Sequence, residues 1–225
     1  TVDTEIQKAC GELLNEKAGS ISVMDIYTGD IIAMYSSPSY DPNLFLFGIS
    51  QDEWQLIRNN PMKPLVNKTL SGNYSPGSTI KPIVALSALE NEIVSSKFTV
   101  NCKGHKHPLE LYGQKYHCWK KEGHGYVSLK EAMKQSCDTY FYEVARLLGV
   151  DRLNITAEKF GLEKKVLGEY FDIEKKGLFP NTIWKKNNLG KGWVLGETLI
   201  TGIGQGYTQT TPLQLCMMTA QIANG

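Results

Sequence analysis

The stretch Ser-Pro-Gly-Ser-Thr-Ile-Lys-Pro, residues 75–82, opens an apolar run that predicts a helix from about Ser78 to Glu90. Pro82 fits there because the first backbone N–H groups of a helix have no internal partner. Residues three apart share a helical face, so the Ser78 hydroxyl and the Lys81 amine can meet. Free N–H donors at the helix start would stabilise an oxyanion, and a buried amine can act as base. Ser78 and Lys81 are therefore a candidate nucleophile and base, although a serine at this place is more often only a helix cap.

A second polar triplet, Ser136-Cys137-Asp138, falls in the predicted link between two helices. The first of these helices begins at Ser128, and Glu131 follows at capping-box spacing. Gly149 ends the second helix. A link of this kind can project a hydroxyl and a carboxylate into a cleft. Ser136 is therefore a candidate proton relay, and Asp138 could hold it in place. The alternative for Asp138 is a helix cap, and the two roles are compatible.

Outward from these motifs, the pattern predicts an α+β fold with helices packed on a sheet. Residues 37–74 read as loop, residues 101–125 as irregular, and residues 161–196 as a surface loop rich in Lys and Gly. Near the start of the chain, the pattern predicts a helix over 4–17, capped by Asp3 and followed by Gly19, and then a hairpin of strands 20–26 and 31–36. Near its end, the pattern predicts a helix over 211–223 with Pro212 at its first position.

Composition excludes several classes of protein. The 225 residues are 41% hydrophobic and 21% charged, which is typical of a folded globular chain. Subtracting 23 acidic from 24 basic residues leaves a net charge of +1, so no basic excess points to nucleic acid. The apolar runs fall far short of the roughly 20 residues that span a bilayer. We expect any membrane anchor to lie outside this chain.

The five cysteines include a group that suggests a metal site. Cys102, Cys118, His124 and Cys137 are separated by 16, 6 and 13 residues, and together they make the Cys₃His set of a closed structural zinc. Adjacent His117 could replace Cys118 as a ligand. A disulfide or unpaired buried thiols are the alternatives. The remaining two cysteines, Cys10 and Cys216, sit on predicted apolar helix faces, where packing explains them.

Taken together, these motifs resemble the transpeptidase domain of the class B penicillin-binding proteins, in particular those that act in cell elongation. The family uses Ser-x-x-Lys, Ser-x-Asn and Lys-Thr-Gly motifs. The resemblance covers essentially the whole chain, and the stretches that carry it are 23–34, 36–43, 75–82, 123–125, 136–142, 202–207 and 211–214.

The resemblance implies the penicillin-binding/β-lactamase-like fold and a role for each motif residue. Ser78 would be the acylated nucleophile, Lys81 its base and Ser136 the proton relay. Asp138 would bind substrate from a position where many family members have Asn, and an Asp there lacks the amide donor. No cofactor is expected for catalysis, and the candidate zinc would be structural.

The same resemblance predicts peptidoglycan D,D-transpeptidation, in which stem peptides ending in D-Ala-D-Ala are cross-linked through an acyl-enzyme that β-lactams also form. Expected partners are stem peptides, β-lactams and membrane proteins of the elongation complex, at the periplasmic face of the inner membrane. The alternatives are a serine β-lactamase or β-lactam sensor, and a zinc-stabilised interaction module without catalysis.

One family motif is missing from these residues. Residues 1–225 contain neither Lys-Thr-Gly nor Lys-Ser-Gly. In the family that motif lines one wall of the cleft and supplies part of the oxyanion hole. We therefore expect residues 1–225 to form part of a transpeptidase domain, with the anchor or pedestal and the Lys-Thr-Gly region outside them. We also expect these residues alone to be poorly acylated.

Overall fold

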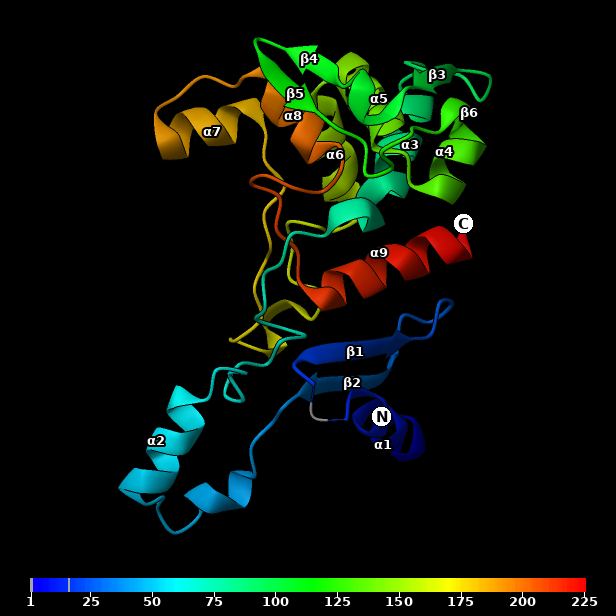
Figure 1. Ribbon diagram of the computed structural model, residues 1–225. Coiled ribbons are helices and arrows are strands. Elements are labelled where there is room, and N and C mark those ends of the chain that lie inside the picture. Colours follow the sequence, from blue (N-terminus) through cyan, green and yellow to red (C-terminus); the bar gives the residue numbers. More distant parts are fainter. Residues whose placement is uncertain (1, 16) are drawn as a thin grey trace. The chain divides into compact units, whose positions relative to one another are not determined.

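The computed structural model describes residues 2–15 and 17–225, which form two compact units (Figure 1). The first unit consists of Thr1–Tyr74, Phe160–Gly177 and Thr210–Gly225, and the second of Ser75–Lys159 and Leu178–Gln209. Helices and antiparallel strands together make an α+β fold, as the sequence predicted. None of the helices in the described residues is long and apolar enough to cross a membrane.

The first unit is built on the predicted hairpin. Strands β1 (Gly19–Met24) and β2 (Ile31–Ser37) pair antiparallel, and the Asp25 carboxylate accepts two main-chain N–H bonds that shape the turn between them. Helix α1 (Thr4–Leu14) packs on β2, and helix α9 (Pro212–Asn224) packs on β1 (Figure 1). The sheet is therefore flanked by the two terminal helices that the sequence predicted.

The caps of these helices agree only in part with prediction. Asp3 accepts hydrogen bonds from the first turn of α1 as expected. However, α1 ends at Leu14 with Asn15 in the left-handed conformation, so Gly19 is not its cap but the first residue of β1. Residue 16 of the predicted helix lies outside the described residues. Thr211 and Gln214 form a reciprocal capping box at the start of α9, with Pro212 at its first position.

The interpretation of residues 37–74 as loop was wrong in one place. A 3₁₀ turn, η1 (Pro42–Phe45), and a helix, α2 (Gln51–Asn59), lie within this segment. Ser50 and Glu53 form a capping box at the start of α2. That Ser-x-x-Glu spacing is visible in the sequence and could have located the helix.

The second unit is mostly helical and surrounds α5. Helix α5 (Asp138–Leu148) packs against α3 (Lys81–Glu90), α6 (Val150–Lys159) and α8 (Leu195–Thr201). It buries Tyr140, Phe141 and Val144 completely. Burial of these side chains fixes the position of α5, whose first residue is Asp138. The motif residues therefore lie at the edge of a well-packed core.

The segment 101–125, expected to be irregular, contains short strands. β3 (Thr99–Cys102) pairs with β6 (Gly125–Ser128), and β4 (Leu109–Leu111) pairs with β5 (Gln114–Tyr116). Helix α4 (Leu129–Gln135) follows β6 directly. Ser128 is its N-cap residue but makes no side-chain cap bond, so the predicted capping box with Glu131 is absent.

Residues 161–196 are not simply a surface loop. They contain the 3₁₀ turn η4 (Gly168–Tyr170), the helix α7 (Thr182–Leu189) and the first two residues of α8. Lys185 of α7 is buried because both Glu197 oxygens accept bonds from its amine. A lysine within a Lys-rich run is thus part of the core rather than of the surface. Its burial was not predicted, because residues 161–196 show no clear hydrophobic pattern.

Candidate active site

Lys81 is the first residue of α3 and one of the most buried side chains of the second unit, with 2% of its surface exposed. Its amine Nζ lies 2.7 Å from Asp138 Oδ1 and 3.0 Å from both the carbonyl oxygen and the hydroxyl of Ser136. Three acceptors therefore meet the three donors that an ammonium group carries. The Phe141 ring lies beneath it, with Nζ 5.3 Å from the ring centroid.

Ser78 lies on a tight turn that ends at Lys81. The expected helix start is a 3₁₀ turn, η2 (Gly77–Ile80), in which the Lys81 N–H bonds to the Ser78 carbonyl. Residues three apart eclipse one another in a 3₁₀ turn, so this geometry keeps Ser78 and Lys81 on one side. Ser78 is exposed, and its hydroxyl makes no hydrogen bond to the residues that the structure describes.

The turn that carries Ser78 is held against the segment around Gly204. The Gly77 N–H donates to the Gly204 carbonyl at 2.9 Å. Gly204 has a φ of 71°, and a Cβ there would lie 2.1 Å from the Gly77 carbonyl oxygen. Only glycine permits this approach. The Gly-rich stretch 202–207 therefore positions the turn that carries Ser78 through close backbone packing.

Ser136 occupies the predicted link between α4 and α5. Its backbone is left-handed, with φ 52° and ψ 46°, which is uncommon for a residue other than glycine. The N–H groups of Ser136 and Cys137 return to the Met133 and Ala132 carbonyls and close the end of α4. This conformation turns the Ser136 hydroxyl and carbonyl toward Lys81.

Asp138 is the first residue of α5 rather than its cap. The cap position belongs to Cys137, which makes no side-chain cap bond, so the predicted capping role of Asp138 is wrong. Its two carboxylate oxygens accept from the Lys81 amine at 2.7 Å and from the Trp119 main-chain N–H at 3.0 Å. A negative charge in the first turn of a helix also interacts favourably with the helix dipole.

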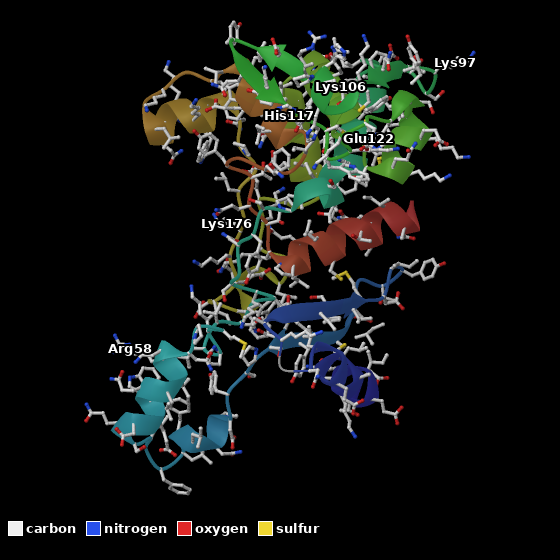
Figure 2. The ribbon with its side chains drawn as sticks, viewed as in Figure 1. Arg58, Lys97, Lys106, His117, Glu122 and Lys176 are labelled. Carbon is white, nitrogen blue, oxygen red and sulfur yellow. The ribbon has the colours of Figure 1, made fainter. Side chains whose placement is uncertain are left out.

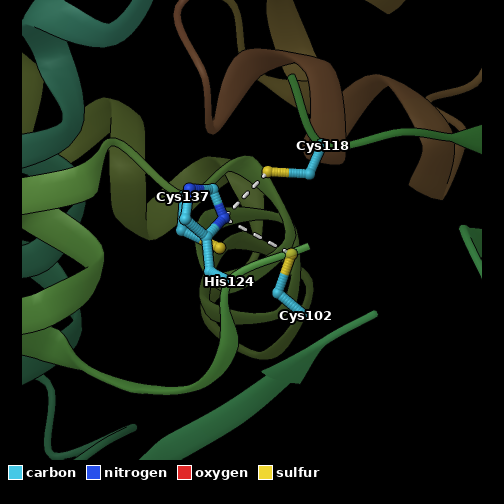
Figure 3. Close-up of side chains that lie close together, drawn as sticks. All are labelled: Cys102, Cys118, His124 and Cys137. Carbon is cyan, nitrogen blue, oxygen red and sulfur yellow. Dashed lines mark hydrogen bonds between the residues drawn. The ribbon is translucent and has the colours of Figure 1, made fainter. Parts of the chain in front are cut away.

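The four predicted metal-ligating residues come together in the second unit. The ligand atoms of Cys102, Cys118, His124 and Cys137 all lie within 4.8 Å of one another (Figure 3). His124 Nδ1 lies 3.5 Å from the sulfur atoms of Cys102 and Cys118. All five cysteines belong to the described residues and none forms a disulfide, so the disulfide alternative is wrong for this structure.

The chemistry of this cluster fits a structural zinc. Three thiols and one imidazole are the soft donor set of a closed tetrahedral site, and the three sulfur-bearing side chains are buried. Hydrogen bonding, first from Cys137, holds the pKa of the Cys118 thiol well below its usual range, and the same contact raises the pKa of the Cys137 thiol, so without a metal the shared proton stays on Cys137 and Cys118 is the thiolate. His124 Nε2 is buried and makes no hydrogen bond to the described residues.

His117 is not a member of the cluster. Its ring packs against that of His105, with the centroids 4.9 Å apart. His117, labelled in Figure 2, lies on the segment between β3 and β6. The alternative in which His117 replaces Cys118 as a ligand is therefore wrong, because the Cys118 sulfur is the atom that faces His124.

Sequence reasoning missed Trp119. This residue follows Cys118, and its indole Nε1–H donates to the carbonyls of Gln135 and Ser136 at 3.2 and 3.1 Å. Its main-chain N–H donates to Asp138, as described above. Adjacency to a candidate ligand was the only signal in the sequence. The contacts themselves depend on a fold that brings residues 119 and 136 together.

Comparison with known proteins identifies the family. Residues 19–225 match the family described as the penicillin binding protein transpeptidase domain. The chain belongs to this family. It is 40% identical over 224 residues to the peptidoglycan D,D-transpeptidase MrdA of Acinetobacter baumannii, with all of the chain and 33% of that protein covered. It is 39% identical over 221 residues to MrdA of Escherichia coli K12, with 96% and 34% covered.

Solved transpeptidase structures share the fold. The structure of Pseudomonas aeruginosa PBP2 in complex with WCK 5153 superposes with a TM-score of 0.91 at 43% identity, over 99% of this chain and 50% of that one. The structure of Helicobacter pylori PBP2 in complex with MreC superposes with a TM-score of 0.91 at 35% identity, over 99% of this chain and 41% of that one. The predicted fold family and the predicted resemblance to PBP2 are thus confirmed. The chain spans about a third of the length of the curated relatives.

Proposed function

We propose that the protein containing this chain is a peptidoglycan D,D-transpeptidase that works through an acyl-serine at Ser78. The observation that carries the proposal is the position of Lys81. Its buried amine is held against Ser136 and Asp138, and it follows the exposed Ser78 hydroxyl by one 3₁₀ turn. A nucleophile one turn before a base that contacts a second hydroxyl supplies the parts that acyl transfer requires.

In the proposed reaction the Ser78 hydroxyl attacks the carbonyl of the penultimate D-Ala of a donor stem peptide. In its neutral amine form, with one of its three donors given up, Lys81 accepts the hydroxyl proton as the new ester bond forms. The C–N bond to the terminal D-Ala then breaks, and Ser136 relays a proton to the departing amine. The amine of a neighbouring stem peptide then attacks the ester carbonyl, and an amide bond forms as the C–O bond to Ser78 breaks. The proton that this amine loses passes to the Ser78 oxygen, so the hydroxyl is restored.

Asp138 favours the first of these steps by its charge. When Lys81 takes up the Ser78 proton it becomes an ammonium ion in a buried position. A carboxylate 2.7 Å away stabilises that ion, because opposite charges interact strongly where water is excluded. Both Asp138 oxygens have internal donors, so we propose that its contribution to substrate binding is made mainly through the placement of Lys81 and Ser136.

We propose that the metal site is structural and takes no part in the chemistry. Cys102 ends β3, Cys118 belongs to the loop before β6, and Cys137 lies between Ser136 and Asp138. A zinc ion held by these residues and His124 would supply a cross-link between the irregular loop and the catalytic link. The chain's own residues would still carry each proton.

The proposed setting is the periplasmic face of the bacterial inner membrane, within a complex for cell elongation. One relative supports this proposal, because H. pylori PBP2 was solved in complex with MreC. By similarity we propose stem peptides, β-lactams and elongation-complex membrane proteins as partners of the protein containing this chain. No nucleic acid is expected, since the net charge is +1.

The proposal is tested by treating the full-length natural protein with penicillin and mapping the modified residue by mass spectrometry. We expect one adduct, on Ser78, and none in Ser78→Ala. The matched control is Ser75→Ala, an exposed serine on the same segment, which should be modified like the unaltered protein. An adduct on another residue, or labelling that survives Ser78→Ala, would refute the proposal.

The same sample separates the alternatives. A β-lactamase would turn over a chromogenic cephalosporin many times, whereas a transpeptidase should release it slowly and retain the adduct. A non-catalytic interaction module would restore cell shape equally well with Ser78→Ala. We expect a long-lived adduct and no rescue by that variant.

A further inference from the structure

Trp119 lies between the metal-ligating cluster and the link that carries Ser136 and Asp138. Its main-chain N–H donates to Asp138 Oδ2 at 3.0 Å, and its indole Nε1–H donates to the carbonyls of Gln135 and Ser136. On the other side, the indole meets the His124 ring edge-on, with centroids 5.4 Å apart. One residue therefore contacts both the cluster and the link.

The indole N–H donates to carbonyl groups that receive no hydrogen bond from within the helix. Gln135 is the last residue of α4, and the final carbonyls of a helix have no partner within it. Ser136 is left-handed, a conformation that costs roughly 1–2 kcal/mol for residues other than glycine. A donor aimed at both carbonyls favours that conformation over an extended one. The Lys81 amine uses the same Ser136 carbonyl as an acceptor.

Packing alone does not account for this tryptophan. The side chain keeps 62% of its surface exposed, so the apolar area that it removes from water is small for its size. Its hydrogen bonds are all directed at the link or at Asp138. What the side chain contributes is therefore chiefly the direction of the Ser136 carbonyl and hydroxyl.

We propose that Trp119 is a positioning residue for acylation, and that its indole N–H holds the Ser136 link so that Ser136 and Asp138 face the Lys81 amine. This inference rests on the proposed function. The hydrogen bonds of Trp119 reach Asp138, Gln135 and Ser136 rather than the amine or Ser78, so it acts through Ser136 and Asp138. Loss of the indole donor should slow the acylation step while leaving the initial, non-covalent binding of the β-lactam intact.

Trp119→Phe in the full-length, metal-loaded protein removes the donor. Phenylalanine keeps an aromatic ring and the main-chain N–H for Asp138, but it loses the indole N–H together with part of the ring that packs on His124. A second variant replaces Trp119 with 3-benzothienylalanine, which has the shape of tryptophan and carries sulfur in place of the N–H. Trp54→Phe is the matched control, since Trp54 lies on α2 of the first unit and packs on Phe45.

The measurement is the dependence of acylation rate on penicillin concentration, which separates the maximal rate constant from the non-covalent dissociation constant. We expect both Trp119 variants to lower the rate constant by about tenfold, the effect of one lost hydrogen bond. We expect the dissociation constant, metal content and unfolding midpoint to match those of Trp54→Phe.

Two results would overturn the inference while the proposed function stands. One is a rate constant equal to that of the unaltered protein, which is itself acylated at Ser78. The other is a lower rate accompanied by loss of metal or a lower unfolding midpoint in both variants, which would mark Trp119 as merely structural. Failure of the proposed function is distinct, because the unaltered protein would then carry no adduct on Ser78.

Discussion

Lys81 and Asp138 form an ion pair that is almost shut off from water, with side chains 2% and 13% exposed. Pairs of this kind add little to stability relative to apolar residues, but removal of one partner is costly because the other charge stays buried. The Ser-x-x-Lys spacing in the sequence predicted a buried lysine beside Ser78. The sequence did not indicate that Asp138 would reach the same amine, since that contact joins residues 57 positions apart.

The ion pair gives a first prediction. Asp138→Ala leaves the Lys81 amine buried without its carboxylate, so we expect the free energy of unfolding to fall by about 3–5 kcal/mol. Asp138→Asn keeps an oxygen acceptor in the same place, and we expect a loss of about 1–2 kcal/mol. Urea unfolding of both variants measures the two values. Equal losses for Ala and Asn would contradict the importance of the pair.

Tyr140 gives a prediction on pH. Its side chain is fully buried, its hydroxyl has no partner among the described residues, and burial raises its pKa from 10.0 to about 12. The folded protein therefore keeps the phenolic proton at a pH where the unfolded chain loses it. This contribution to stability is complete below about pH 10 and is lost as the pH rises toward 12.

Tyr140→Phe removes that titration. We expect the variant to match or slightly exceed the parent in stability at pH 7, because an unpartnered buried hydroxyl disappears. Between pH 10 and 12 the variant should gain about 1–2 kcal/mol relative to the parent. Unfolding by denaturant at several alkaline pH values measures the difference, and parallel curves for the two proteins would contradict the account.

At the scale of elements, the segment from β3 to α5 determines the site. β3 and β6 pair at the base of the loop, and Gly123 approaches so closely that a Cβ there would lie 2.2 Å from the Cys102 carbonyl oxygen. The ligand set was evident in the sequence because Cys and His are rare and chemically distinctive. The short strands were not, because four-residue segments with little apolar alternation carry almost no pattern.

Removal of the metal should therefore affect these elements first. A zinc ion would cross-link the loop of residues 101–125 to the link between α4 and α5. Dialysis against a chelator should therefore lower the unfolding midpoint and increase amide exchange at β3, β6 and the start of α5. Cys102→Ser should reproduce this, whereas Cys10→Ser, a buried thiol of α1 outside the cluster, should leave metal content unchanged. A folded natural protein with no stoichiometric zinc before dialysis would contradict the site.

At the scale of the whole molecule, the sequence sufficed for the fold class and the family because several specific stretches agree along its length. It sufficed less well where structure depends on distant contacts. Helix α7 was missed because Lys185 looks like a surface residue until Glu197 is placed beside it. The 3₁₀ turn at Ser78 likewise depends on Gly204, more than a hundred residues away.

The central claim is that the Lys81 amine removes the proton from Ser78, and the most direct test is the acylation rate constant of Lys81→Met in the full-length natural protein. Methionine has a similar length and no base, and circular dichroism checks that the variant is folded. The account predicts a rate constant about 10²- to 10⁴-fold lower, the usual contribution of a general base. A folded variant that acylates Ser78 as fast as the unaltered protein would contradict it.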